Sequence, residues 1–396
     1  MNNNFKRIFK FFCTKVVFIY MLQNTIILCL ELPKDRFDLD ESIFLFDSGV
    51  NWDKNSVFGL NHLLLTEINF LKKFNAKGLD SLIFNFSYSF EITDKKDTKI
   101  SSYLILKHKN FYSYLNPNIV NDNSAFNGYT GVPREKSRLG FNSGETNASG
   151  FGYKNQNILF QIGRGRENWS AGDEIGLALS KNSPSYDYFK FIYEKNKIRF
   201  IYFHGFLENI DAHNRYITGK GLEFTNKKSL ILGFSEIIIY SGLNRPIDFA
   251  YFNPTSSHLE IELNDRQNLL GPDDANAVWQ LSFDFLIRPN IRLSSNLIVD
   301  ELTMDKIELD SGKVSGLGFS SRLSIFKKFN DQLLTFYGKY ISVGTHTFRH
   351  AHGYNNFVQR GLPLGWEYGS DGYIIAIGVN YHNADNLIIK SSLGKL

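Results

Sequence analysis

Three clusters of polar and aromatic residues contain the side chains that could bind a saccharide. Aromatic faces stack on sugar rings, carboxylates and amides hydrogen-bond to hydroxyl groups, and arginine forks hold acidic sugars or phosphates. The clusters contain Arg164, Arg166 and Trp169; Arg215 and Tyr216; and Arg245, Asp248, Tyr251 and Asn253. A second interpretation also fits these residues. Polar groups inside a barrel need partners, so they could instead form a network that stabilises the lumen.

The sequence gives weaker support for a metal site, a nucleotide site or a hydrolytic site. His346, His350 and His352 lie close together, but no HExxH-like helix frames them, so we expect a polar loop and no metal site. Asp273-Asp274 fits a solvated turn better than a calcium loop. Gly163-Arg164-Gly165 is not followed by a predicted helix, so we expect no nucleotide site and no cofactor. Carboxylates such as Glu174 and Glu223 could serve a hydrolase, but the sequence does not pair them, and we expect no enzyme.

The elements that must position these residues are strands with one apolar and one polar face. Segment 81–92 alternates with a period of two, and 278–287 repeats the pattern. Further strands are expected at 157–163, 174–180, 188–194, 197–205, 230–240, 277–288, 291–301, 333–344, 372–382 and 386–392. Tight turns such as Pro289-Asn290 contrast with long segments such as 116–155, which is typical of outer-membrane barrels. The pattern predicts an all-β protein, a closed antiparallel transmembrane barrel of about 16 strands.

Composition and charge argue against two classes of protein. Aromatic residues make up 15% of the 396 residues, yet the mean hydropathy is −0.23, which excludes a bundle of transmembrane helices. The net charge of +4 is small and scattered, so no nucleic-acid partner is expected.

The N-terminus predicts the domain organisation. Residues 1–32 are basic and then apolar and read as a signal peptide, with an uncleaved anchor or a lipidated Cys29 as alternatives. Residues 33–80 have apolar residues at helical spacing and predict a small helical periplasmic element, or else a linker with one helix. The barrel would then span 81–396. Both cysteines, Cys13 and Cys29, lie in the leader, so the mature chain would have none.

Several ordered motifs resemble the capsule assembly Wzi family. They are Gly163–Asp173, Leu177–Ser180 with Pro184, Asp187-Tyr188, Asn214–Ile217, Leu222–Phe224, Leu232–Glu236, Arg245–Pro254 and Gly361–Gly365. The resemblance covers roughly residues 155–380. It implies an outer-membrane barrel of eighteen antiparallel strands with a periplasmic helical bundle that acts as a lectin, so that the expected number of strands is about 16–18. It also adds Asp187 and Tyr188 to the candidate residues. The chain departs from the pattern at its last strand, which lacks a terminal aromatic residue, and over 93–155.

The expected function is therefore attachment of capsular or extracellular polysaccharide to the outer membrane of a Gram-negative bacterium. The expected partners are this polymer and outer-membrane lipid, and the expected state is monomeric. A porin or solute channel is the alternative, because alternating strands alone fit both classes.

Overall fold

The computed structural model describes residues 52, 55–59, 83–92, 97–126, 128–269, 275–301, 316–329, 332–350, 353–383 and 387–396. These residues form one 15-stranded antiparallel sheet in chain order. Its strands are β1 (Ile83–Ile92), β2 (Thr98–His108), β3 (Phe111–Val120), β4 (Ser143–Lys154), β5 (Ile158–Gly165), β6 (Tyr186–Lys195), β7 (Ile198–Phe206), β8 (His213–Thr225), β9 (Leu230–Leu243), β10 (Ala275–Arg288), β11 (Ile291–Glu301), β12 (Gly316–Phe329), β13 (Gln332–Val343), β16 (Gly372–Asn383) and β17 (Leu387–Lys395). The prediction of a predominantly β, antiparallel chain is confirmed.

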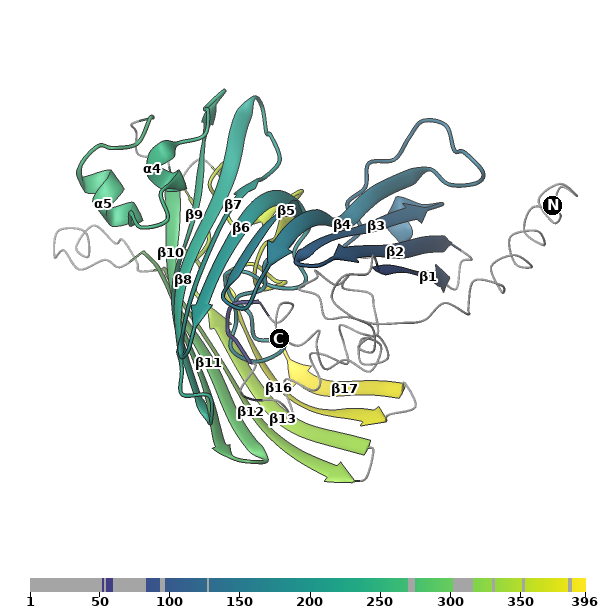
Figure 1. Ribbon diagram of the computed structural model, residues 1–396, viewed down its shortest axis with the longest axis vertical. Coiled ribbons are helices and arrows are strands. Elements are labelled where there is room, and N and C mark those ends of the chain that lie inside the picture. The colour runs from purple at the N-terminus through teal and green to yellow at the C-terminus, as the bar shows by residue number, and fades with distance from the viewer. Residues whose placement is uncertain are drawn as a thin grey trace, which may run out of the picture.

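The sheet curls strongly but does not close within the described part of the chain. Figure 1 shows β1 and β17 as its two edge strands, on either side of a gap. The prediction of a closed barrel with about 16–18 strands is therefore not met by the described residues. The estimate assumed about 20 residues per strand and connection. Four connections have 20 residues or more, at 121–142, 166–185, 244–274 and 344–371, and they lower the strand count.

The alternating sequence explains which face of each strand points outward. On β10, Gln280, Ser282 and Asp284 are fully buried on the concave side, whereas Leu281 is 51% exposed on the convex side. The same alternation recurs on β12, where Arg322 is buried and Leu323 is exposed. On these strands the inner face is polar and the outer face is apolar, as expected for a barrel wall in lipid.

The two rims of the sheet differ, as the sequence predicted. On one rim, called here the tight-turn rim, residues 109–110, 196–197 and 289–290 join neighbouring strands. Lys109 and Asn196 have φ values of 53° and 58° there, as two-residue hairpin turns require. The connections on the opposite, long-loop rim are longer.

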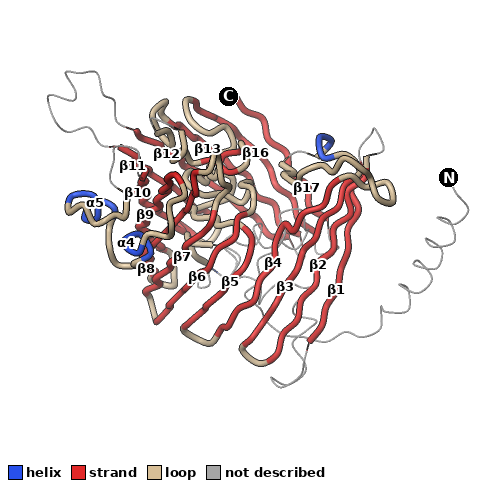
Figure 2. Tube along the Cα trace, turned by 90° about the horizontal axis from the view of Figure 1, so that it is seen from above, coloured by secondary structure: helices blue, strands red, loops and turns tan. Residues whose placement is uncertain are grey.

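The longest connections lie on opposite sides of the wall. Residues 166–185, called the inner loop, lie in the hollow of the sheet, where Figure 2 shows several connections gathered. Residues 244–269, called the outer cover, carry α4 (Phe249–Phe252) and α5 (His258–Leu263) and lie against the convex wall (Figure 1). Residues 344–350 and 353–371, called the rim loop, contain the two-residue strands β14 (Val358–Gln359) and β15 (Leu362–Pro363). A short 3-10 turn, η5 (Asn123–Ala125), follows β3.

Some strand predictions were wrong. Residues 174–180 form part of the inner loop and not a strand, because their backbone bonds to side chains and to the rim loop instead of to a neighbouring strand. The structure also has five strands that were not predicted: β2, β3, β4, β8 and β12. One of them, β4, lies inside segment 116–155, which was predicted to be a long loop.

The N-terminal predictions fall almost entirely outside the described residues. The signal peptide, both cysteines and the helical element at 33–80 lie there, except for Trp52 and residues 55–59. The backbone amide of Val57 donates to Glu223 on β8 at 2.8 Å, and the ring of Phe58 lies 5.0 Å from that of Trp169. This short piece therefore packs on the inner face of the sheet. No helix within the described ranges has the length and apolar character needed to cross a membrane.

Candidate functional site

The inner loop fills the hollow of the sheet with buried apolar residues. It starts after β5 and reaches the inward-facing side chains of β10 to β13, on the far side of the hollow. Ile175, Leu177 and Leu179 within it are fully buried. The carbonyl of Leu177 accepts a hydrogen bond from the backbone of Trp366 at 2.9 Å, so the inner loop also holds the rim loop.

Two amide side chains attach the inner loop to the wall. Asn296 on β11 accepts a hydrogen bond from the amide of Ala171 at 2.8 Å and donates to the carbonyl of the same residue at 3.0 Å. Gln280 on β10 donates to the carbonyl of Trp169 at 2.9 Å. Each bond satisfies a backbone group that has left regular secondary structure and is buried. The loop is therefore a bonded part of the interior.

The tip of the inner loop carries charge that the wall neutralises. Asp173 pairs with Lys181 at 2.7 Å, and Glu174 pairs with Lys339 of β13 at 2.9 Å. Burial raises the pKa of Asp173, but the positive charges of Lys181 and Arg322 outweigh burial and hold this pKa well below its usual range. Burial and Asp173 likewise raise the pKa of Glu174, yet Lys339 and Arg322 leave it lowered. Both carboxylates are therefore ionised and paired at neutral pH.

Two residues of the first predicted cluster, Arg166 and Trp169, lie inside. Trp169 is fully buried, and its indole nitrogen donates to Glu167 at 3.0 Å. Arg166 donates to Asn147 and to Ser185 and is also buried.

Tyr188 and Arg215 also face the hollow. The hydroxyl of Tyr188 accepts from Gln161 at 3.0 Å. Arg215 donates to the backbone carbonyls of Tyr354 at 2.5 Å and Asn356 at 2.8 Å, and so fastens the rim loop. Their partners are groups of the protein itself.

The third cluster belongs to the outer cover and packs, together with Tyr216 of β8, on the opposite, convex side of the wall. Tyr240 stacks with Tyr216 on one side and Tyr251 on the other, both at 4.8 Å between ring centroids. Arg245 pairs with Asp248 at 2.8 Å and lies over the Tyr240 ring. The structure therefore brings these residues together as the packing between cover and wall.

Three predicted residues remain accessible. Arg164 and Asp187 form an ion pair at 3.0 Å near the long-loop rim, and the Asp187 side chain is 64% exposed. Asn253 is half-buried in the outer cover, where its side-chain oxygen accepts a hydrogen bond from the backbone amide of Thr255. Saccharide binding by these residues stays a prediction. The contacts of the buried residues match the alternative interpretation, a network of internal partners.

Metal-binding groups are sparse in the described ranges. No group of three or more His, Cys, Asp or Glu side chains in those ranges could hold a metal ion. His346 and His350 lie in the rim loop, while His352 and the pair Asp273-Asp274 fall outside the described residues.

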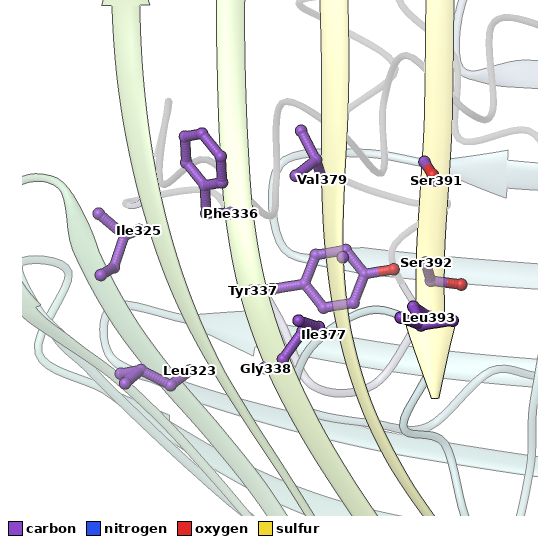
Figure 3. Close-up of a pocket in the computed structure, with 11 residues that line it drawn as sticks. Leu323, Ile325, Phe336, Tyr337, Gly338, Ile377, Val379, Ser391, Ser392 and Leu393 are labelled. Carbon is purple, nitrogen blue, oxygen red and sulfur yellow. The ribbon is translucent and has the colours of Figure 1, made fainter. Parts of the chain in front are cut away.

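An apolar hollow of about 510 Å³ opens on the convex wall over β12, β13, β16 and β17. Figure 3 shows Ile325, Phe336 and Ile377 among the side chains around it. Gly338 leaves open space at its base, since a Cβ there would meet no heavy atom within 4 Å. Its lining offers little to a sugar hydroxyl.

A second hollow of about 650 Å³ lies at the long-loop rim and is called the rim cleft. Its aromatic walls are Trp366, Tyr368 and Tyr373, and its polar groups include Asp371 and Ser370. Sequence reasoning missed these residues, although the run from Trp366 to Tyr373 interleaves aromatic and acidic residues in the same way as the predicted clusters.

Comparison with known proteins supports the fold. No protein-family model and no curated protein sequence matches the chain. Among solved structures, the chain is similar to Wzi, an outer-membrane protein involved in group 1 capsule assembly in Escherichia coli and described as a carbohydrate-binding β-barrel. The TM-score is 0.56 at 15% identity, covering 79% of this chain and 69% of Wzi.

Two further solved structures give lower scores. An OmpT variant of Vibrio cholerae that lacks loop L8 has a TM-score of 0.41 at 10% identity, covering 80% of this chain and 93% of that one. OccK11 of Pseudomonas aeruginosa has a TM-score of 0.39 at 9% identity, covering 81% of each chain. The similarity to Wzi, at a TM-score of 0.56, is the one that indicates the fold: the chain has a fold like that of the Wzi barrel.

Proposed function

We propose that this protein lies in the outer membrane of a Gram-negative bacterium, binds capsular or extracellular polysaccharide and holds it at the cell surface without catalysing a reaction. It acts as a monomer whose convex wall faces lipid and whose long-loop rim faces outward. Retention comes from several weak contacts to a repeating polymer, where avidity replaces one tight site. The fold shared with Wzi supports this proposal.

One observation favours binding over the alternative of a porin. A porin needs an open aqueous lumen. Here the inner loop crosses the hollow, and Asn296 and Gln280 bond its backbone to the opposite wall. Opening a path would expose Leu177 and Leu179 and break these bonds, so we assign the lumen a structural role.

The direct test is binding of polysaccharide, extracted from cells that express the protein, to the purified full-length chain in lipid nanodiscs. The proposal predicts saturable binding that is lost when the nanodiscs are empty. Absence of binding to the extracted polymer would refute it. Planar-bilayer recordings address the alternative: we expect a sealed protein, and stable porin-like conductance steps at neutral pH would favour a channel.

A further inference from the structure

The rim cleft has the composition of a sugar-binding site. Tyr368 is 52% exposed and presents its ring at this rim, whereas Tyr373, which is 41% exposed, lies on the same outward face of β16 as Ile375 and borders the cleft from that side. The ring of Trp366 lies 5.4 Å from that of Tyr368, inclined at 58°. Aromatic rings arranged around a hollow provide stacking surfaces for the apolar face of a pyranose.

The cleft also contains hydrogen-bonding groups that the protein leaves unused. Trp366 is only 4% exposed, yet its indole Nε1 has no hydrogen-bond partner among the described residues. A buried donor without a partner costs free energy, and a sugar oxygen that reached Nε1 from the adjoining cleft would recover it.

The carboxylate of Asp371 is positioned at the same hollow. Its Oδ1 accepts a hydrogen bond from Thr345 at 2.6 Å, and within the described residues its other oxygen makes no hydrogen bond. The backbone amide of Asp371 donates to Val343 at 3.1 Å, so β13 fixes the start of β16 and the position of the carboxylate. A fixed carboxylate oxygen can accept from a sugar hydroxyl.

The charge of the cleft selects the class of sugar. Asp371 provides the one charged side chain among the lining residues that the structure describes. Arg349 lies in a smaller neighbouring hollow of about 130 Å³, where its Nε donates to Ser370 at 2.7 Å. A carboxylate in the cleft repels uronic acids, while its lone pairs favour hydroxyl donors.

We propose that the rim cleft binds a neutral, hydroxyl-rich sugar residue of the polymer; this rests on the proposed function. Tyr368 stacks on the ring, Asp371 accepts from its hydroxyls, and Trp366 Nε1 donates to an oxygen of the sugar. The cleft lies at the long-loop rim, where a surface polymer can reach it.

The test uses the full-length protein in nanodiscs and the polysaccharide extracted from cells that express it. Tyr368→Ala and Asp371→Asn should each weaken binding about tenfold, and Trp366→Phe, which keeps a ring but removes the donor, should weaken it severalfold. Asp371→Asn retains an oxygen for Thr345, so the loop stays in place. Tyr340→Ala is the matched control, because Tyr340 is 40% exposed on the outer wall and lies outside the cleft.

The possible results distinguish a failure of the rim-cleft proposal from a failure of the proposed function. If the wild type binds the polymer and all three cleft variants bind it with the same affinity, the proposal that the rim cleft binds sugar is overturned. If the wild type does not bind, the proposed function itself is refuted. Chemical reduction of the polymer's carboxyl groups tests the sugar class. Binding should survive reduction, and its loss would overturn the assignment of a neutral sugar.

Discussion

Replacing Asn296 by alanine should release the inner loop from the wall. The side chain makes two hydrogen bonds to Ala171, at 2.8 and 3.0 Å, and Ala171 is fully buried. Asn296→Ala leaves the buried N–H of Ala171 without a partner, whereas the carbonyl of Ala171 keeps the hydrogen bond from the Ser170 hydroxyl at 2.9 Å. The unpaired donor costs about 1–3 kcal/mol and the other lost hydrogen bond about 1 kcal/mol, so we expect loop docking to weaken by about 3 kcal/mol in total. At 1.36 kcal/mol per factor of ten, the open population should rise about a hundredfold.

Amide hydrogen exchange measured by mass spectrometry reports this population directly. Peptides that cover residues 169–180 should exchange about a hundredfold faster in Asn296→Ala, while peptides from β8 and β9 should keep their protection. Ser295→Ala is the control, since Ser295 is the next residue on β11 and bonds to Ser321 away from the loop at 2.9 Å. Equal protection of the inner loop in wild type and Asn296→Ala would show that the loop is not held by this contact.

Three further predictions concern the loop and the wall. The folded-state pKa values of Asp173 and Glu174 are lowered, so the stability that these carboxylates contribute is complete above the ordinary carboxyl range and is lost as pH falls through the folded-state values. Acid should therefore expose Trp169 and shift the tryptophan fluorescence to the red. Asp173→Asn should weaken this dependence on pH. Gly365→Ala should lower the free energy of unfolding by about 1–3 kcal/mol, because its Cβ would lie 1.7 Å from the Leu177 carbonyl oxygen, whereas Gly338→Ala should be neutral in thermal melts. Leu281→Arg places a charge on the outer wall, which should destabilise the protein folded in a bilayer by about 2–4 kcal/mol near the midplane and lower the folding yield into lipid vesicles. Leu281→Phe should leave the yield unchanged. Equal yields for the two variants would place this wall in water.

Alternation in the sequence predicts some strands, whereas glycine hides others. The period of two predicts β10 and β16 directly, and the same alternation is present in β3 and β12, which were not predicted. Strands β4 and β8 read as loops because glycine interrupts them.

Ring packing on the inner face requires these glycines. A Cβ at Gly150 would lie 2.7 Å from the Tyr114 hydroxyl, and one at Gly219 would lie 2.3 Å from the Phe203 ring. The glycines therefore make room for aromatic rings of other strands. No local pattern encodes such a contact.

The roles of the candidate residues depend on the same long-range contacts. Trp169 and Arg166 have the composition of a binding cluster, and only the passage of the inner loop across the sheet buries them. Trp169 meets Gln280, which lies 111 residues further along the chain. Sequence alone could place the polar groups near strand ends but could not tell a lumen partner from a ligand contact. The rim cleft likewise forms only where the rim loop returns beside β13 and β16.

The most direct test of the central claim is the distribution of polysaccharide in cells that lack the gene. We predict that total polymer stays the same while the cell-associated share falls and the released share rises, and that expression of the wild-type chain restores retention. Unchanged cell-associated polymer in the deletion strain would contradict a role in holding polysaccharide at the surface.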